Sequence, residues 1–242
     1  MAMKTTQSTR PCVNTCLLTV LAAIVLFAPQ AYAETYVAGQ FGVALPSIGE
    51  GLTDVDLTGA FPAGSTMSDR SLKTSVLYGA KLGYFFPQAR WFGIEAEIFN
   101  TTPHIKEQST TISVPPSPTV TGGTTTAIVS GDHFSVLTLA PLNLVFRYPT
   151  NSRLQPYVAV GPGIFFGRVE SIATGFEGSQ SSTKLGLNAQ VGFRYFVTRH
   201  VTVFGEWKFD HVRFNFKEND TQFGFNGTYN MHQVAFGIGY HF

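Results

Sequence analysis

Eight charged residues stand at alternating positions within otherwise apolar segments, four of them basic and four acidic. In a β-strand, alternate side chains point to the same face, so this spacing places each charge on one face of its strand. Charges in a low-dielectric interior are tolerated only when they are paired, so we predict a neutral salt-bridge network, with an ion or proton path as the alternative. The predicted members are Lys81, Glu95, Glu97, Arg147, Arg194, Glu206, Lys208 and Asp210.

Two groups of residues could support catalysis. His133 and Ser135 lie two positions apart, on one face of a predicted strand, where a histidine could activate a serine nucleophile. His211 and His232 flank a long connection, and strand parity places both on an outward apolar face. No third residue completes a nucleophile, base and orienting group, so we assign no catalytic residue and no metal site, and an enzyme stays the less favoured alternative.

The elements that position these residues are eight segments of about ten residues with the period of two that is typical of strands. Short connections at 87–90, 149–155 and 197–200 alternate with long ones at 46–75, 100–134, 167–184 and 211–233. This pattern predicts an all-β, eight-stranded antiparallel up-and-down transmembrane barrel, with both termini in the periplasm. The predicted strands are 36–45, 76–86, 91–99, 135–148, 157–166, 185–196, 201–210 and 234–242.

Composition narrows the class of protein further. Only 13% of residues are charged, about half the share in a soluble domain. A secreted barrel with an apolar interior is the alternative, but the polar strand face is rich in glycine, and aromatics stand at the strand ends, as in membrane girdles. No basic surface for nucleic acid is present, because the formal net charge is +1. The aromatics include Tyr84, Phe86, Phe92, Tyr148, Tyr195, Tyr240 and Phe242.

Residues 1–33 have the pattern of a secretory signal peptide, which leaves 34–242 as the barrel domain. Lys4 and Arg10 precede an apolar stretch at 16–28, and Ala-Tyr-Ala at 31–33 is a small-x-small cleavage site. The apolar stretch is too short to span a membrane comfortably as a helix. Both cysteines lie in this leader, so we expect the mature chain to have no disulfide and no cysteine metal site.

Three stretches, at 93–97, 154–163 and 192–207, together with the last strand, resemble the family of eight-stranded outer-membrane β-barrels that includes the OmpA transmembrane domain and the opacity-type surface proteins. The resemblance implies that Phe236, Tyr240 and Phe242 form the signal that the barrel-assembly machinery reads. It also implies a monomer in the outer membrane of a Gram-negative bacterium, in contact with lipid and lipopolysaccharide, without a cofactor. Some family members act as lipid A deacylases or oxidases.

Function in such a barrel is expected in the loops. The connection at 108–131 is rich in threonine, serine, proline and glycine, which predicts a mobile surface loop. We therefore expect a barrel that anchors four surface-exposed loops in a structural or surface-interaction role. A lipid A-modifying enzyme is the second hypothesis and a narrow, porin-like channel is the third, since eight strands enclose little more than their own side chains.

Overall fold

The computed structural model describes residues 34–46, 51–148, 152–171, 178–220 and 222–242. The predicted signal peptide at 1–33, with Cys12 and Cys16, lies outside the described residues. Every regular element within them is a β-strand, and they contain no helix that is long and apolar enough to cross a membrane.

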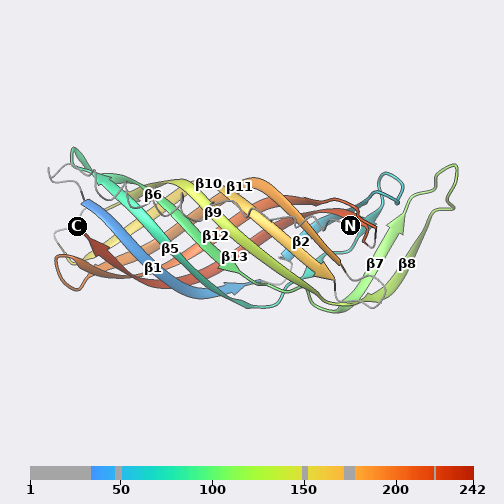
Figure 1. Cartoon of the computed structure of the whole chain (residues 1–242), viewed down its shortest axis with the longest axis horizontal. Coiled ribbons are helices and arrows are strands. Elements are labelled where there is room, and N and C mark those ends of the chain that lie inside the picture. The colour runs from blue at the N-terminus through green and yellow to red at the C-terminus, as the bar shows by residue number, and fades with distance from the viewer. Residues whose placement is uncertain (1–33, 47–50, 149–151, 172–177, 221) are drawn as a thin grey trace, which may run out of the picture. The chain divides into compact units, whose positions relative to one another are not determined.

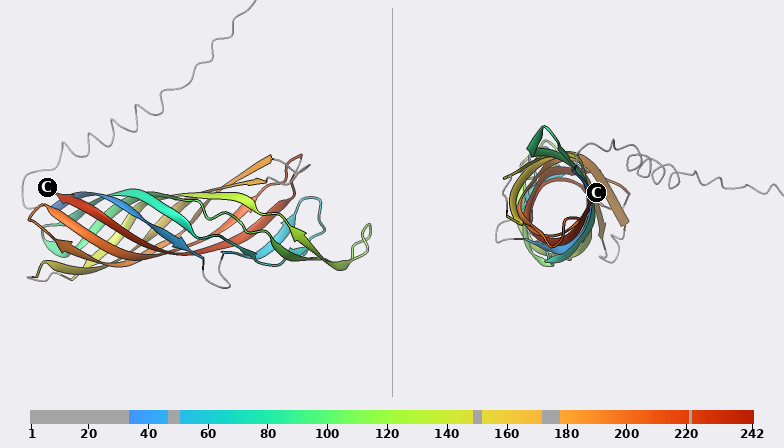
Figure 2. Two further views of the ribbon diagram at one scale, coloured as in Figure 1. Left: turned by 90° about the horizontal axis from the view of Figure 1, so that it is seen from below. Right: turned by 90° about the vertical axis from the view of Figure 1, so that its left-hand side faces the viewer.

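Eight long antiparallel strands form a closed ring (Figure 1). Each strand pairs with the next in the ring, and β1 closes it by pairing with β13 from Tyr36 opposite His241 to Leu45 opposite His232. Seen along its axis, the strands form a closed ring (Figure 2). The predicted eight-stranded up-and-down barrel is therefore confirmed. The strands are β1 (Glu34–Leu45), β5 (Ser75–Phe86), β6 (Ala89–Thr101), β9 (Asp132–Arg147), β10 (Leu154–Ser171), β11 (Gly178–Phe196), β12 (Val201–Phe216) and β13 (Gly224–His241).

The two ends of the barrel differ. At the turn end, residues 87–88 and 197–200 join neighbouring strands, and β1 begins and β13 finishes there. At the opposite end, which we call the loop end, the strands run further than the sequence periodicity predicted. β11 begins at Gly178, β12 continues to Phe216 and β13 begins at Gly224. The strands are longer than predicted because inner and outer side chains keep alternating beyond the part of the wall whose outer face is apolar.

The long connections at the loop end build an additional sheet. β2 (Gly51–Thr58) pairs with β13 beyond the point where β1 has ended. β3 (Thr66–Met67) pairs with both β2 and β7 (Gln108–Val114), and β4 (Arg70–Ser71) also pairs with β2. The result is that the barrel sheet continues from β13 through β2 and β3 to β7 and β8 (Figure 1).

The segment at 108–131, which composition predicted to be a mobile surface loop, consists largely of a β-hairpin. β7 pairs with β8 (Gly123–Val129) in continuous register, from Gln108 opposite Val129 to Val114 opposite Gly123. Threonine, valine and isoleucine recur through both strands, and such β-branched residues favour strands. Composition indicated a loop, but the branched side chains within that composition favoured the hairpin.

The two faces of the barrel wall alternate as the periodicity predicted. Outward side chains are apolar and partly or fully exposed, and Trp91 and Phe92 contact Phe146 at the turn end of the outer face. The register shifts beside Pro141 on both of its neighbouring strands, as expected where a proline cannot donate to the ladder.

Candidate functional site

Five of the eight predicted charges meet in the middle of the bore. Lys81 on β5 lies at the centre, with Nζ 3.1 Å from Glu95 Oε1 on β6 and 2.8 Å from Glu206 Oε2 on β12. Lys208 on β12 pairs with Glu97 and lies 3.2 Å from the second carboxylate oxygen of Glu206. All five side chains are at most 2% exposed. The cluster therefore links strands from opposite parts of the ring through buried charges.

Neutral polar side chains complete this cluster. The Tyr36 hydroxyl donates to Glu95, and the Tyr157 hydroxyl donates to Glu206 Oε2 at 2.5 Å. Gln40 Nε2 donates to Glu97 Oε1 at 2.6 Å, and Gln190 Oε1 accepts from Lys81 Nζ, also at 2.6 Å. Because buried carboxylates are stable only when their oxygens accept hydrogen bonds, these neutral groups stabilise the charged state of the cluster.

The other three predicted charges lie apart from it. Arg147 pairs with Glu34 at the turn end, with Nη2 2.5 Å from Oε2. Arg194 places its guanidinium 4.2 Å from the centre of the Tyr36 ring. Asp210 accepts hydrogen bonds of 2.7 Å from the side-chain amides of Asn188 and Gln233. The bore thus holds one ionic cluster with separate polar contacts on either side of it.

Two ionisable groups in the bore were not singled out from the sequence. Glu34 accepts from Arg147, and His241 Nδ1 lies 2.8 Å from Glu34 Oε1. Both residues lie on the inner face by strand parity, so the alternating sequence pattern could have identified them. The pattern was weak there because each residue stands at the end of its strand, where few alternating residues flank it.

An apolar layer fills the loop half of the bore, above the ionic cluster. Phe134 on β9, Phe214 on β12 and Tyr229 on β13 are fully buried there, and their rings contact one another edge to face. Phe165 and Met231 belong to the same buried cluster. The predicted salt-bridge network therefore occupies only the middle of the bore, and aromatic packing closes the remainder towards the loop end.

The residues considered for catalysis lie on the outer face. Phe134 and Val136, which alternate with His133 and Ser135, are fully buried, so the latter two point outward on β9. His133 contacts the His104 ring at 4.8 Å between centres, and His104 Nδ1 accepts from the Phe134 amide. Burial and the neighbouring His133 lower the pKa of His104. This local arrangement offers a hydrogen-bonded imidazole but no hydrogen bond from Ser135 to it.

His211 and His232 also lie on the outer face, as predicted. His211 Nδ1 is 2.6 Å from Asn230 Oδ1, and the His232 ring stacks against Trp207 with centres 5.1 Å apart. In the ring order, β10 and β11 separate these histidines from His133 on β9. The structure therefore does not bring the four residues together. Among the described residues, no three histidine, cysteine, aspartate or glutamate side chains form a group that could hold a metal ion.

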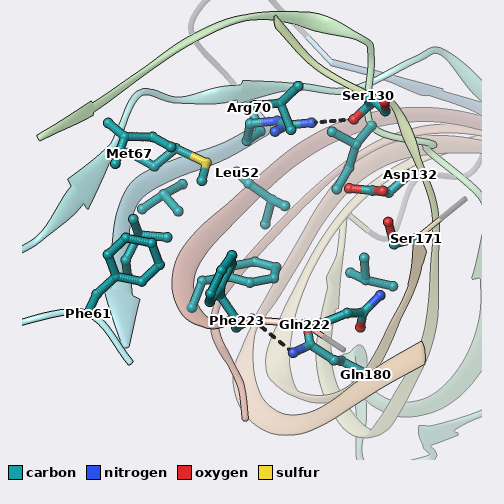
Figure 3. Close-up of a pocket in the computed structure, with 17 residues that line it drawn as sticks. Leu52, Phe61, Met67, Arg70, Ser130, Asp132, Ser171, Gln180, Gln222 and Phe223 are labelled. Atoms are coloured by element: carbon teal, nitrogen blue, oxygen red, sulfur yellow. Dashed lines mark hydrogen bonds between the residues drawn. The ribbon is translucent and has the colours of Figure 1, made fainter. Parts of the chain in front are cut away.

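A cavity of about 300 Å³ lies at the loop end (Figure 3). Its apolar wall comes from the added sheet, from β10 and β13, and from the adjoining connections, and it includes Phe61, Met67 and Phe223. Sequence reasoning missed it because its lining comes from connections that carry no shared periodicity. The other apolar lining residues are Leu52, Val55, Leu57, Ile105, Ile112, Val129, Val169 and Phe225.

Polar side chains gather on one side of this cavity, with Arg70, Ser130, Asp132, Ser171 and Gln180 in sequence along it (Figure 3). Arg70 donates from Nη2 to the Ser130 carbonyl at 3.1 Å. Burial lowers the pKa of Arg70, and the charge of Asp132 opposes that shift. Burial also raises the pKa of Asp132, against a hydrogen bond from Ser171 and the charge of Arg70.

The family model for the outer membrane protein β-barrel domain matches residues 18–242. The chain belongs to this family of outer-membrane β-barrels. Its place is accordingly the outer membrane of Gram-negative bacteria. None of the curated proteins matches the sequence.

Solved structures agree on the fold. The chain is similar to the outer membrane protein OprG from Pseudomonas aeruginosa, with 17% identity, 87% of this chain and 96% of that chain covered, and a TM-score of 0.55. It is also similar to Neisserial surface protein A, with 11% identity, coverage of 87% and 99%, and a TM-score of 0.51. At these identities the likeness supports the same barrel architecture and nothing finer.

Proposed function

We propose that this outer-membrane barrel acts as a monomeric anchor for a cell-surface interaction region, with the loop end facing outward and both barrel termini in the periplasm. One observation carries the proposal: side chains fill the bore, while the connections at the loop end build an ordered sheet from β2, β3, β7 and β8. Charged and aromatic groups packed across a narrow bore favour a structural role over conduction. Lipid and lipopolysaccharide surround the outer face, and no cofactor is needed for this role.

An epitope-insertion experiment tests the orientation. A short epitope inserted at Ser117, in the segment that joins β7 to β8, should bind antibody on intact cells, because this hairpin projects farthest at the loop end (Figure 1). The matched control carries the same epitope at Arg199, in the turn between β11 and β12, and should bind antibody only after the outer membrane is permeabilised. Labelling of Arg199 insertions on intact cells would reverse the proposed orientation.

Two measurements separate this role from the other hypotheses. Purified barrel in planar bilayers should show no regular conductance steps, because the ionic cluster and the aromatic layer occupy the bore. Cells that express the protein should keep an unchanged lipid A mass profile. A mass shift that disappears in the His133→Ala or Ser135→Ala variant would contradict the proposal in favour of an enzyme.

The last strand is proposed to carry the assembly signal. Phe236, Tyr240 and Phe242 are exposed on the outer face, and the Phe242 amide donates to the Thr35 carbonyl at 2.9 Å, next to the closing pair of β1 and β13. We expect Phe242→Ala to reduce folded barrel in the outer membrane several-fold, measured by heat-modifiable gel mobility. Phe193→Ala is the control, because Phe193 is equally exposed on β11 but lies away from the terminal strand. Equal losses in both variants would argue against a terminal signal.

A further inference from the structure

The cavity at the loop end has the composition of a site for a small amphipathic molecule. We propose that it binds a neutral alcohol with an apolar body, whose hydroxyl group lies between Arg70 and Asp132. This binding activity goes beyond the surface-anchor role. It rests on three features of the cavity: an apolar wall, a buried donor without a partner, and a compensating carboxylate on the same side (Figure 3).

The apolar wall would take the body of the ligand. Eleven apolar side chains line the cavity, and Phe61 and Met67 lie on the side opposite Asp132 and Ser171 (Figure 3). Removing apolar surface from water is the main driving force for binding in such pockets. Leu52 and Val55, which line the cavity, also belong to the buried cluster that fills the loop half of the bore, so this part of the lining is apolar.

Arg70 supplies the unsatisfied donor. This side chain is 6% exposed, and its Nη2 group donates to the Ser130 carbonyl. Its Nε–H group is buried and has no hydrogen-bond partner within the described residues. A buried donor without a partner is costly, and a guanidinium donor forms stronger hydrogen bonds than a neutral group does. A ligand that presents an oxygen to Nε would therefore gain a hydrogen bond that the protein alone does not make.

Asp132 determines which oxygen group fits. Its carboxylate lines the same polar side as Arg70, so the two ionic charges balance across this part of the cavity. A carboxylate ligand would add a second negative charge beside Asp132, and an ammonium ligand would add a second positive charge beside Arg70. Unpaired charge in an apolar site is strongly unfavourable. A neutral head group is therefore favoured over either ion.

A hydroxyl group matches both residues at once. Its oxygen can accept from Arg70 Nε, while its O–H can donate to the Asp132 carboxylate. An ether or ketone could satisfy Arg70 only, and an alkane could satisfy neither residue. Sites built to hydrogen-bond a hydroxyl group discriminate strongly against analogues that lack it, because the protein groups are then left unpaired.

Methionine methyl NMR tests the inference on the full chain in lipid nanodiscs. Met67 lines the cavity, whereas Met231 is fully buried in the barrel and serves as an internal reference. Titration with 1-octanol should shift the Met67 methyl signal saturably. Octane and octanoate, which share the chain length, should bind at least about tenfold more weakly, because octane makes neither hydrogen bond and octanoate places a second negative charge beside Asp132.

Matched variants separate cavity binding from partition into lipid. Val129→Trp should fill the cavity and abolish the octanol shift, while Ile128→Trp, on the exposed side of the same strand, should leave it unchanged. Arg70→Gln should reduce the preference for octanol over octane, because the hydroxyl oxygen loses its charged donor while Asp132 remains as an acceptor. Asp132→Asn should raise octanoate affinity about tenfold, because the repelling carboxylate is gone while an acceptor remains. Heat-modifiable mobility checks that each variant is folded.

Every other outcome overturns the inference. If no ligand shifts Met67, or if Val129→Trp leaves the shift intact, the cavity is not the binding site. Equal shifts with octane and octanol would show that Arg70 and Asp132 do not recognise a hydroxyl group. Tighter binding of octanoate than of octanol by the unmodified protein would identify an anion site instead.

Discussion

Replacing Lys81 by methionine should lower the free energy of unfolding of the barrel by about 3 to 5 kcal/mol, the cost typical of removing one partner from a buried ion pair. Lys81 Nζ contacts Glu95, Glu206 and Gln190, and its side chain is 2% exposed. Without it, two buried carboxylates lose their nearest cation. Urea unfolding in lipid vesicles, followed by tryptophan fluorescence and gel mobility, measures the change.

Two control variants test whether the loss of stability in Lys81→Met comes from the buried carboxylates. Lys184→Met on β11 removes an exposed lysine and should change stability by no more than about 0.5 kcal/mol. In the double variant Lys81→Met with Glu206→Leu, one of the carboxylates is removed as well, so part of the lost stability should return. A Lys81→Met change as small as that of Lys184→Met would show that the bore is hydrated enough to solvate its own charges.

The inner position of the charged residues could be predicted because strand parity depends only on local spacing. Lys81, Glu95 and Glu206 each stand between outward apolar neighbours, and the structure places all three inside. Which charges pair could not be predicted, because pairing depends on the stagger between strands. Parity gives the same inner face to Arg194, yet its guanidinium lies over the Tyr36 ring instead of beside a carboxylate in the central cluster.

The aromatic layer could also have been predicted from the sequence, but the predicted strands ended before its residues. After Asp210, the residues Val212, Phe214 and Phe216 continue the inner face, with His211, Arg213 and Asn215 between them. The outer face turns polar there because the strand continues beyond the apolar belt. A membrane-spanning strand has an apolar outer face and a polar inner face. Residues 211–216 have the reverse arrangement, so the prediction assigned them to a loop.

The cavity could not be predicted in the same way. Arg70, Ser130 and Asp132 come from two different connections, and they meet only because β2 pairs with β13 and β3 pairs with β7. Each of these pairings joins residues that are far apart in the sequence. Local periodicity does not indicate these pairings. In addition, β3 and the strand that carries Arg70, β4, are each only two residues long.

Gly42→Ala should prevent the barrel from closing, because Gly42 lies in the pair of strands that completes the ring. A Cβ atom at this position would lie 2.1 Å from the Val234 carbonyl oxygen and 2.7 Å from Ala235 Cα, both of which are backbone atoms of β13. Backbone atoms in a hydrogen-bonded ladder cannot move aside as the end of a side chain can. Relief of the overlap requires β1 and β13 to separate between their paired residues Gly42 and Ala235.

The expected result is loss of the compact, heat-modifiable form after refolding into lipid vesicles, together with exposure of strand edges that promote aggregation. Gly39→Ala is the matched control in the same strand, since a Cβ atom there meets nothing within 4 Å. Both variants add one methyl group and have the same effect on the unfolded chain. A difference between them therefore reports the contact across the closing pair. Equal yields of folded barrel from the two variants would show that β1 and β13 can separate at Gly42 without loss of closure.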